Sequence, residues 1–322
     1  MHRRIGRIQW SLLGRTTYCS GNPGRTPVLT SAIKKGLDVI ALVTAATLPK
    51  LCEDDQPLLS ALTDAGIAFT IATWDDATVD WADFDAVILR SPWDYTERPD
   101  EFLAWHEGVS QLSRVHNGPD LVRRSIHKRY LVELAAAGIN VIPTVVVGTQ
   151  HEAKRIANER AWELAVLKPS IGLGGRSMSL FRHDTELAQT PLRGKDSEWC
   201  VQPYVPSIRT EGEYSVVVIN GAVQHALVKR PGANDFRVHD GRGGTHESHP
   251  VTDELAARAA DVLHAFGASA SLYARVDLVR DEGGHLAVME LDVISPCLYT
   301  EHNPDLAPAF ATAVAQLGEP HR

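Results

Sequence analysis

The sequence of 322 residues lacks the features that mark several broad classes of protein. Its four cysteines, Cys19, Cys52, Cys200 and Cys297, lie far apart and form no CxxC pair, so neither a disulfide framework nor a zinc or redox motif is indicated. No apolar run approaches the roughly 18 residues that a membrane span needs, and there is no internal repeat. The ordinary globular composition excludes a disordered, collagen-like or coiled-coil chain. We therefore expect a reduced cytoplasmic protein that contacts no membrane.

The chain also has fewer basic than acidic residues. The net charge of −8 does not favour a nucleic-acid partner, so small-molecule chemistry is the first expectation. The charge is uneven: residues 1–37 contain seven lysines and arginines and no acid, which leaves a net charge of −15 on the rest of the chain. We expect residues 1–36 to be a poorly ordered basic extension, and an arginine-rich transit peptide is the alternative.

The order of apolar segments predicts an N-terminal open α/β sheet. Three short strands are expected at 37–43, 67–72 and 85–89, and a helical stretch with Leu58 and Leu62 on one stripe separates the first two. Strand, helix, strand and a further strand is the rhythm of an open α/β sheet.

From about residue 120 the chain becomes rich in strands. Ser125 is expected to cap a helix that ends at Gly138, and the pair Asn220-Gly221 predicts a two-residue hairpin turn. A long helix is expected at 252–266. The remaining strands are expected at 141–147, 165–168, 178–181, 200–205, 214–219 and 222–229. We therefore divide the chain after the extension into an N-terminal α/β domain (37–120), a central subdomain (121–200) and a C-terminal subdomain (201–322).

The segment Arg90–Tyr95 comes at the end of the third expected strand. Ligands usually bind at the carboxyl edge of an open α/β sheet, so Ser91, Trp93, Asp94 and Tyr95 are candidates for substrate contact. The alternative is a loop whose two aromatic side chains pack on the edge of the domain.

A glycine-rich loop, Lys168–Arg176, is the first chemical motif. It lacks the Gly-Lys-Ser/Thr of a Walker loop, and the residues after it alternate like a strand, whereas a dinucleotide fingerprint needs a helix there. We expect Gly172, Gly174 and Gly175 to form a flexible lid over a nucleotide, with Lys168 reaching a phosphate. A plain glycine hairpin is the alternative.

Three carboxylates are expected on one hairpin near the C-terminus. Glu290 and Asp292 are two residues apart and so share a strand face, and Asp277 joins them if the turn between the strands has two or four residues; an odd bulge would break this argument. Converging carboxylates repel unless a cation is present, and Mg²⁺ prefers carboxylates together with phosphates. The alternative is a solvated sheet face, with Arg275 partly offsetting the charge.

Several cations lie in the polar segment between these two motifs. Lys229 and Arg230 end the expected hairpin, and Arg237 and Gly244 follow in a long loop suited to enclosing a charged, reactive group. Glu213, at the start of the hairpin, is a candidate for a ribose or metal contact. An exposed basic loop is the alternative.

Together these segments resemble the ATP-grasp superfamily of carboxylate–amine ligases, from about residue 38 to the end. The motifs that support the resemblance are His127-Lys128 on a helix, Leu167-Lys168-Pro169, Gln202-Pro203-Tyr204-Val205, Gly212-Glu213, Lys229-Arg230, Asp235-Phe236-Arg237 with Gly243-Gly244, Asp277, and Glu290-x-Asp292. One departure is Asp292, because the last metal ligand of the family is often Asn. This departure changes the charge of the metal site.

The resemblance implies two α+β subdomains that clasp ATP, and roles for individual residues. ATP would be bound by Lys128, Lys168, Gly172, Gly174, Gly175, Gln202, Tyr204, Val205 and Glu213. Two Mg²⁺ ions would be bound by Asp277, Glu290 and Asp292. Lys229, Arg230 and Arg237 would stabilise the transferring phosphoryl group and the acyl phosphate, and Ser91, Trp93, Asp94, Tyr95 and Gly244 would contact the substrate.

The implied reaction is an ADP-forming ligation, in which a carboxylate becomes an acyl phosphate that an amine nitrogen attacks. Arg90–Tyr95 and Met289–Pro296 resemble a bacterial subgroup, which implies ring closure within O-ureido-D-serine. The alternatives are an intermolecular amino-acid or peptide ligase and a non-catalytic nucleotide-binding module. We expect a small-molecule carboxylate and amine as partners and no nucleic acid; the oligomeric state, a homo-oligomer included, stays open.

Overall fold

The computed structural model describes residues 37, 39–184 and 198–318. The predicted basic extension, the transit-peptide alternative and Cys19 lie outside the described residues. Cys52, Cys200 and Cys297 are free thiols. None of the helices in the described ranges is long and apolar enough to cross a membrane.

The first sheet is the predicted open α/β sheet. Its strands are all parallel, in the order β2-β1-β3-β4, and every residue of β1 and β3 is buried. These apolar strands suit a parallel sheet that is covered on both faces. The strands are β1 (Ile40–Thr44), β2 (Phe69–Thr73), β3 (Ala86–Ser91) and β4 (Arg114–His116), and the helices beside them are α1 (Gln56–Asp64) and α2 (Pro99–Ser110). β4 and α2 were not predicted.

The second sheet is antiparallel and includes the two strands that flank the glycine-rich loop. Its order is β5-β8-β6-β7, and α5 buries Ala153 and Ala157 against it. The elements are β5 (Val145–Val147), α5 (Gln150–Glu159), β6 (Leu164–Pro169), β7 (Ser179–Arg182) and β8 (Trp199–Pro203). The glycine-rich loop therefore joins two strands, as predicted. β8 crosses the position where we divided the two subdomains.

The third sheet is also antiparallel, in the order β11-β10-β9-β12-β13. Its strands are β9 (Glu213–Ile219), β10 (Ala222–Arg230), β11 (Thr245–His249), β12 (Tyr273–Arg280) and β13 (Leu286–Asp292), and the short helix α6 (Ser207–Thr210) precedes them. The predicted hairpin turn is confirmed, because Asn220 and Gly221 both have positive φ, 46° and 77°. The predicted long helix is α7 (Asp253–Phe266), which begins after the cap Thr252 and packs on this sheet. β11 lies where we expected a loop.

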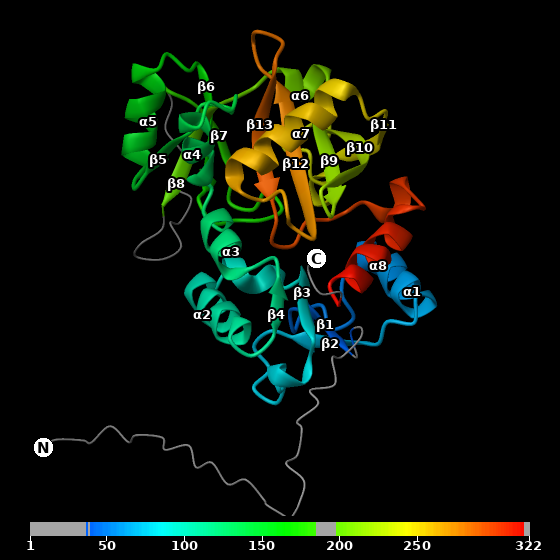
Figure 1. Cartoon of the computed structure of the whole chain (residues 1–322). Coiled ribbons are helices and arrows are strands. Elements are labelled where there is room, and N and C mark those ends of the chain that lie inside the picture. The colour runs from blue at the N-terminus through cyan, green and yellow to red at the C-terminus, as the bar shows by residue number, and fades with distance from the viewer. Residues whose placement is uncertain (1–36, 38, 185–197, 319–322) are drawn as a thin grey trace, which may run out of the picture. The chain divides into compact units, whose positions relative to one another are not determined.

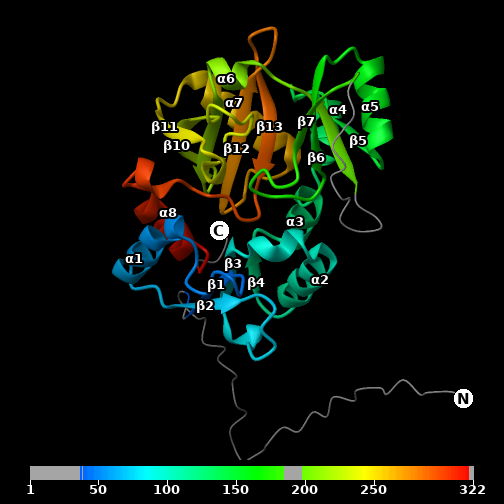
Figure 2. The ribbon, with the colours of Figure 1, turned by 180° about the vertical axis from the view of Figure 1, so that it is seen from behind.

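The last helix returns to the first sheet. α8 (Leu306–Gln316) lies beside α1, although the two helices are at opposite ends of the chain (Figures 1 and 2). Leu306, Phe310 and Val314 of α8 share one core with Ile40 and Leu62. The C-terminal segment thus ties the N-terminal sheet to the third sheet.

One predicted helix is wrong in its details. The chain forms α3 (Pro119–Ser125), a bend and then α4 (Tyr130–Ala136), so Ser125 ends a helix and its hydroxyl donates to the carbonyl of Val122. Lys128 lies in the bend and not on a helix, because its backbone N–H donates to Ser170 of the neighbouring loop at 2.8 Å. A tertiary hydrogen bond here replaces the helical one that the sequence pattern predicted.

The carboxylate hairpin places its three acidic residues on one face, as predicted, but the pairing of its strands differs from the prediction. Arg280 pairs with Leu286, so the turn has an odd number of residues and would by itself place Asp277 opposite Met289. A bulge between Asp277 and Leu278 shifts the register by one, so that Asp277 pairs with Glu290. The two irregularities cancel, and Asp277, Glu290 and Asp292 share one face.

Candidate active site

A cavity of about 500 Å³ contains most of the predicted site residues. Strands of the second and third sheets contribute its walls, among them β6, β8, β10, β12 and β13. Asp277, Glu290 and Asp292 all line it, and we call these three residues the carboxylate wall. The predicted convergence of the three carboxylates is therefore present in the structure.

Asp277 of the carboxylate wall is buried, whereas Glu290 and Asp292 are half-buried. Asp277 accepts hydrogen bonds from Ser215, from Lys229 at 3.3 Å and from Arg275 at 3.0 Å. Burial alone would raise the pKa of Asp277, but Arg275 and Lys229 hold it below its usual value. Burial raises the pKa of Asp292, whose Oδ1 accepts from the backbone N–H groups of Ile294 and Ser295. This wall has the charge and the oxygen ligands that a hard divalent cation requires.

Two lysines from the second sheet and the bend before α4 face the same wall. Lys128 Nζ lies 3.1 Å from Glu290 Oε1 and donates to the carbonyl of Gly172 at 2.8 Å. Lys168 is 4% exposed, and burial lowers its pKa although Glu290 opposes this effect. Both lysines hold the pKa of Glu290 below its usual value against the effect of burial. Cations and carboxylates thus meet in one cavity, which is the arrangement that a metal-bound polyphosphate needs.

A further buried lysine, Lys229, forms ion pairs with two carboxylates. Lys229 Nζ lies 2.5 Å from Glu213 Oε1 and 3.3 Å from Asp277 Oδ1. Burial lowers the pKa of Lys229, but the two carboxylates more than offset it, and the pKa of Glu213 is raised by burial. Lys229 and Glu213 both line the cavity, and their predicted phosphoryl and ribose roles stay predictions.

The glycine-rich loop covers part of the cavity and is fastened to the loop opposite. Gly175 has φ of 64°, and a Cβ there would come within 2.8 Å of His239 Nδ1. Arg237 donates to the carbonyl of Gly175 at 3.1 Å and is itself held by Asp235 at 2.7 Å. Because side chains at Gly175 would collide with the opposite loop, glycine is required for this close approach.

The other end of the cavity is more apolar. Gln202, Tyr204 and Val205 line it, as predicted, together with Ile208 and Met289. The Gln202 amide donates to Thr144 Oγ1 at 2.8 Å. An apolar slot beside a strand edge suits a flat heteroaromatic ring.

Three predicted substrate contacts in the first domain do not line the cavity. Ser91 donates to Asp55, Asp94 accepts from Trp74 at 2.8 Å, and Tyr95 is buried against Phe102. Of the Arg90–Tyr95 segment, only Trp93 lines the cavity. Substrate contact by Ser91, Asp94 and Tyr95 stays a prediction, and in the structure their side chains make contacts within the domain and do not line the cavity.

Gly244 and Arg230 also lie elsewhere than predicted. Gly244 packs against the backbone of Val238 without room for a Cβ, which is a structural reason for glycine. Arg230 pairs with Glu247 on the neighbouring strand, and its side chain is 40% exposed and does not line the cavity. Strand alternation explains this, because Lys229 points into the cavity and the next residue must point away.

Sequence reasoning gave too little weight to Arg275 and missed Tyr299. Arg275 lines the cavity and donates to Asp277 and to the carbonyl of Cys297, and Tyr299 lines the same side. Arg275 lies two residues before Asp277 on β12, so strand alternation alone predicts that the two side chains share a face. Tyr299 has no such sign, because it follows β13 in an irregular segment.

Two family models match the chain. Residues 40–117 match the N-terminal domain of D-cycloserine synthetase DcsG, and residues 133–304 match the ATP-grasp domain of prokaryotic glutathione synthetase. The chain belongs to the ATP-grasp superfamily and is an ATP-dependent ligase that forms C–N bonds. ATP-grasp ligases use ATP and Mg²⁺.

Within the superfamily the chain is similar to one particular enzyme. The cycloserine biosynthesis protein DcsG of Streptomyces lavendulae is 35% identical over 304 residues, which cover 88% of this chain and 100% of the relative. The crystal structure of D-cycloserine synthetase DcsG matches with a TM-score of 0.78 at 33% identity, over 87% of this chain and 100% of that one. ATP-grasp ligase PsnB, in a complex with Mg and ADP, shares the fold with a TM-score of 0.63 at 17% identity, over 88% of this chain and 100% of PsnB.

Proposed function

We propose that the chain closes a ring within O-ureido-D-serine, at the expense of ATP, and so forms D-cycloserine for antibiotic biosynthesis. The observation that best supports this substrate is the similarity to DcsG, which extends over the whole of that relative and includes the N-terminal domain. The glutathione synthetase model matches only residues 133–304. The N-terminal domain therefore favours the cyclo-ligase.

The cavity residues fit MgATP as a co-substrate. Lys128 and Lys168 supply positive charge for the phosphates, and the carboxylate wall supplies oxygen ligands for two Mg²⁺ ions. When bound, Mg²⁺ neutralises phosphate charge and orients the phosphates for transfer. The apolar end, with Gln202, Tyr204 and Val205 among its residues, would hold the adenine, and Glu213 the ribose.

Arg237 and Lys229 are the residues we assign to the transferring phosphoryl group. Both line the cavity, and Arg237 also links the glycine-rich loop to the opposite loop. Fixed cations stabilise the charge that spreads over the phosphoryl oxygens in the transition state. Arg230 is left out of this assignment because Glu247 holds it outside the cavity.

The proposed reaction has two bond-forming steps. A carboxylate oxygen of the substrate attacks the γ-phosphorus of ATP, ADP leaves, and an acyl phosphate results. The nitrogen bonded to the side-chain oxygen then attacks the acyl carbon, loses its proton and expels phosphate, which closes a five-membered ring. Hydrolysis removes the carbamoyl group. Because the nucleophile and the electrophile belong to one molecule, the effective concentration of the nucleophile at the acyl carbon is high.

The test is ADP formation with O-ureido-D-serine as the only organic substrate besides ATP, with the product identified by mass. We expect ADP and D-cycloserine in equal amounts without any added amine. Glu290→Gln serves as the matched control and should release no ADP. ADP that appears only after a second amino acid is added, together with a dipeptide, would select an intermolecular ligase instead.

A further inference from the structure

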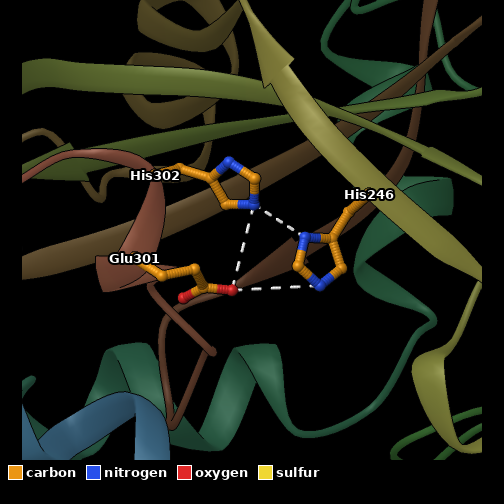
Figure 3. A group of neighbouring side chains, drawn as sticks. All are labelled: His246, Glu301 and His302. Atoms are coloured by element: carbon orange, nitrogen blue, oxygen red, sulfur yellow. Dashed lines mark hydrogen bonds and ion pairs between the residues drawn. The ribbon is translucent and has the colours of Figure 1, made fainter.

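A cluster of metal-ligating side chains lies outside the carboxylate wall. His246 is near the start of β11, and Glu301 and His302 belong to the short 3-10 helix Thr300–His302 (Figure 3). One possible ligand atom from each of the three lies within 4.8 Å of the other two. The fold thus brings together residues that are more than fifty positions apart in the sequence.

The imidazole rings face each other edge to face. His246 Nδ1 lies 2.7 Å from His302 Nε2, and the ring planes are inclined by 70°. Glu301 Oε1 lies 3.9 Å from His302 Nε2 and 3.9 Å from His246 Nε2 (Figure 3). The other nitrogen of His302, Nδ1, lies 2.8 Å from Ser248 Oγ. A hydroxyl on Nδ1 fixes the orientation of the ring and directs Nε2 toward the cluster, as partners of metal-binding histidines do.

The cluster is short of positive charge. Glu301 forms ion pairs only with His246 and His302, and Asp240 Oδ2 only with His246 Nε2, at 3.5 Å, among the residues that the structure describes. No lysine or arginine in these ranges pairs with either carboxylate. Both carboxylates are more than half exposed, so the cluster is open to a cation from solvent.

We propose that His246, Glu301 and His302 bind a transition-metal cation of the Zn²⁺ type, at a site separate from the Mg²⁺ site. Imidazole nitrogens favour Zn²⁺ and its neighbours, whereas Mg²⁺ prefers oxygen ligands alone. On a tetrahedral Zn²⁺ two nitrogens lie about 3.3 Å apart. The rings therefore need to separate slightly when the metal replaces the proton between them. A water molecule completes the coordination.

The position of this site gives it a role in shaping the active-site cavity. Asp240 and Tyr299 line the cavity, and the ring of Tyr299 meets that of His246 edge to face, with centroids 5.0 Å apart. A cation at the cluster would cross-link β11 to the segment after β13. Tyr299, in the segment after β13, lines the cavity together with Arg275.

The test is direct metal binding to the full chain, free of any histidine tag and stripped with chelator. Co²⁺ is titrated in the presence of excess Mg²⁺, and its visible absorption is recorded because tetrahedral Co²⁺ has a characteristic intense band. We expect one tightly bound Co²⁺ per chain, which Zn²⁺ displaces. His246→Gln and His302→Gln should each weaken binding by more than about tenfold and abolish the band.

Two control variants make the result specific. His151→Gln changes an exposed histidine on α5, and Glu290→Gln changes the carboxylate wall, and both should retain the Co²⁺ band. A band that is lost in Glu290→Gln but kept in His302→Gln would overturn the proposal, because Co²⁺ would then occupy the Mg²⁺ site. No band in the wild-type chain would also overturn it.

Discussion

Two clusters of charged side chains in this protein have a similar composition but different surroundings. In the first domain, Arg90 Nη2 lies 2.7 Å from Asp55 Oδ1, and Ser91 donates to the other oxygen of Asp55 at 2.6 Å. Arg90 also donates to the carbonyl of Pro296 and lies over the ring of Tyr273. Neither Arg90 nor Asp55 lines the active-site cavity.

The cluster around Asp277 opens into the cavity. Lys229, Arg275 and Glu213 line the cavity with Asp277. Asp292, which has no ion pair among the residues that the structure describes, adds a further carboxylate. A sealed cluster with matched charges stabilises one fold, whereas an open cluster with surplus carboxylates is suited to a ligand. Buried charge therefore indicates function here only where it borders a cavity. The following predictions test this difference.

The largest effect is expected for Glu290→Gln in the open cluster. The change keeps the shape of the side chain but removes a metal-binding charge, so turnover should fall by at least about 10²–10³-fold. The measurement is steady-state ADP release, with thermal unfolding as the check on folding. Near-normal turnover would show that Glu290 holds no catalytic metal.

Asp55→Asn in the sealed cluster should act on stability instead. It leaves the buried Arg90 without its counter-charge, which costs about 3–5 kcal/mol of unfolding free energy. Denaturant unfolding measures this loss, and turnover per folded molecule should stay close to normal. The control is Asp75→Asn, which breaks a half-exposed pair with Arg98 and should cost less than about 1 kcal/mol. Equal losses in both variants would contradict the assignment.

Lys168→Ala should weaken nucleotide binding about 10- to 100-fold, because a hydrogen bond to a charged group contributes about 1.5–3 kcal/mol. Calorimetric titration with MgADP gives the dissociation constant. Lys50→Ala, at an exposed lysine of the first domain, provides the comparison and should bind normally. Wild-type affinity in the Lys168 variant would remove this residue from the phosphate site.

Trp93→Ala and Asp94→Asn compare a residue of the Arg90–Tyr95 segment that lines the cavity with one that does not. Trp93 lines the cavity, so its loss should raise KM for the organic substrate about tenfold, which equals about 1.4 kcal/mol. Asp94→Asn, one position on, should leave KM unchanged because Asp94 bonds to Trp74 and Arg98. The opposite ranking of the two variants would place the substrate elsewhere.

The smallest effect is expected from deletion of residues 1–34. This segment contains none of the motifs of the cavity, and the remaining chain from Lys35 forms a compact unit of its own. Activity should remain within a few-fold of the full chain. A variant that unfolds would show that the extension contributes to the core.

The sequence was sufficient for the class of fold and for most of the cavity. Strand alternation and glycine spacing placed Lys168, the glycine-rich loop and the carboxylate wall correctly. The sequence was insufficient wherever a tertiary contact decided the outcome. Ser91 bonds to Asp55, which is distant in sequence, and Tyr95 packs on Phe102 of the unpredicted helix α2. The bend at Lys128 depends on Ser170. No local feature of the sequence predicts the bulge that aligns Asp277 with Glu290.

The central claim is that the carboxylate wall and the two lysines together bind the metal–nucleotide complex. A crystal structure of the full chain with ADP and Mn²⁺ in place of Mg²⁺ tests it most directly, because anomalous scattering locates the ions. Our account predicts Mn²⁺ bound to Asp277, Glu290 and Asp292, with the phosphates against Lys128 and Lys168. Mn²⁺ bound away from these carboxylates, or a nucleotide outside the cavity, would contradict it.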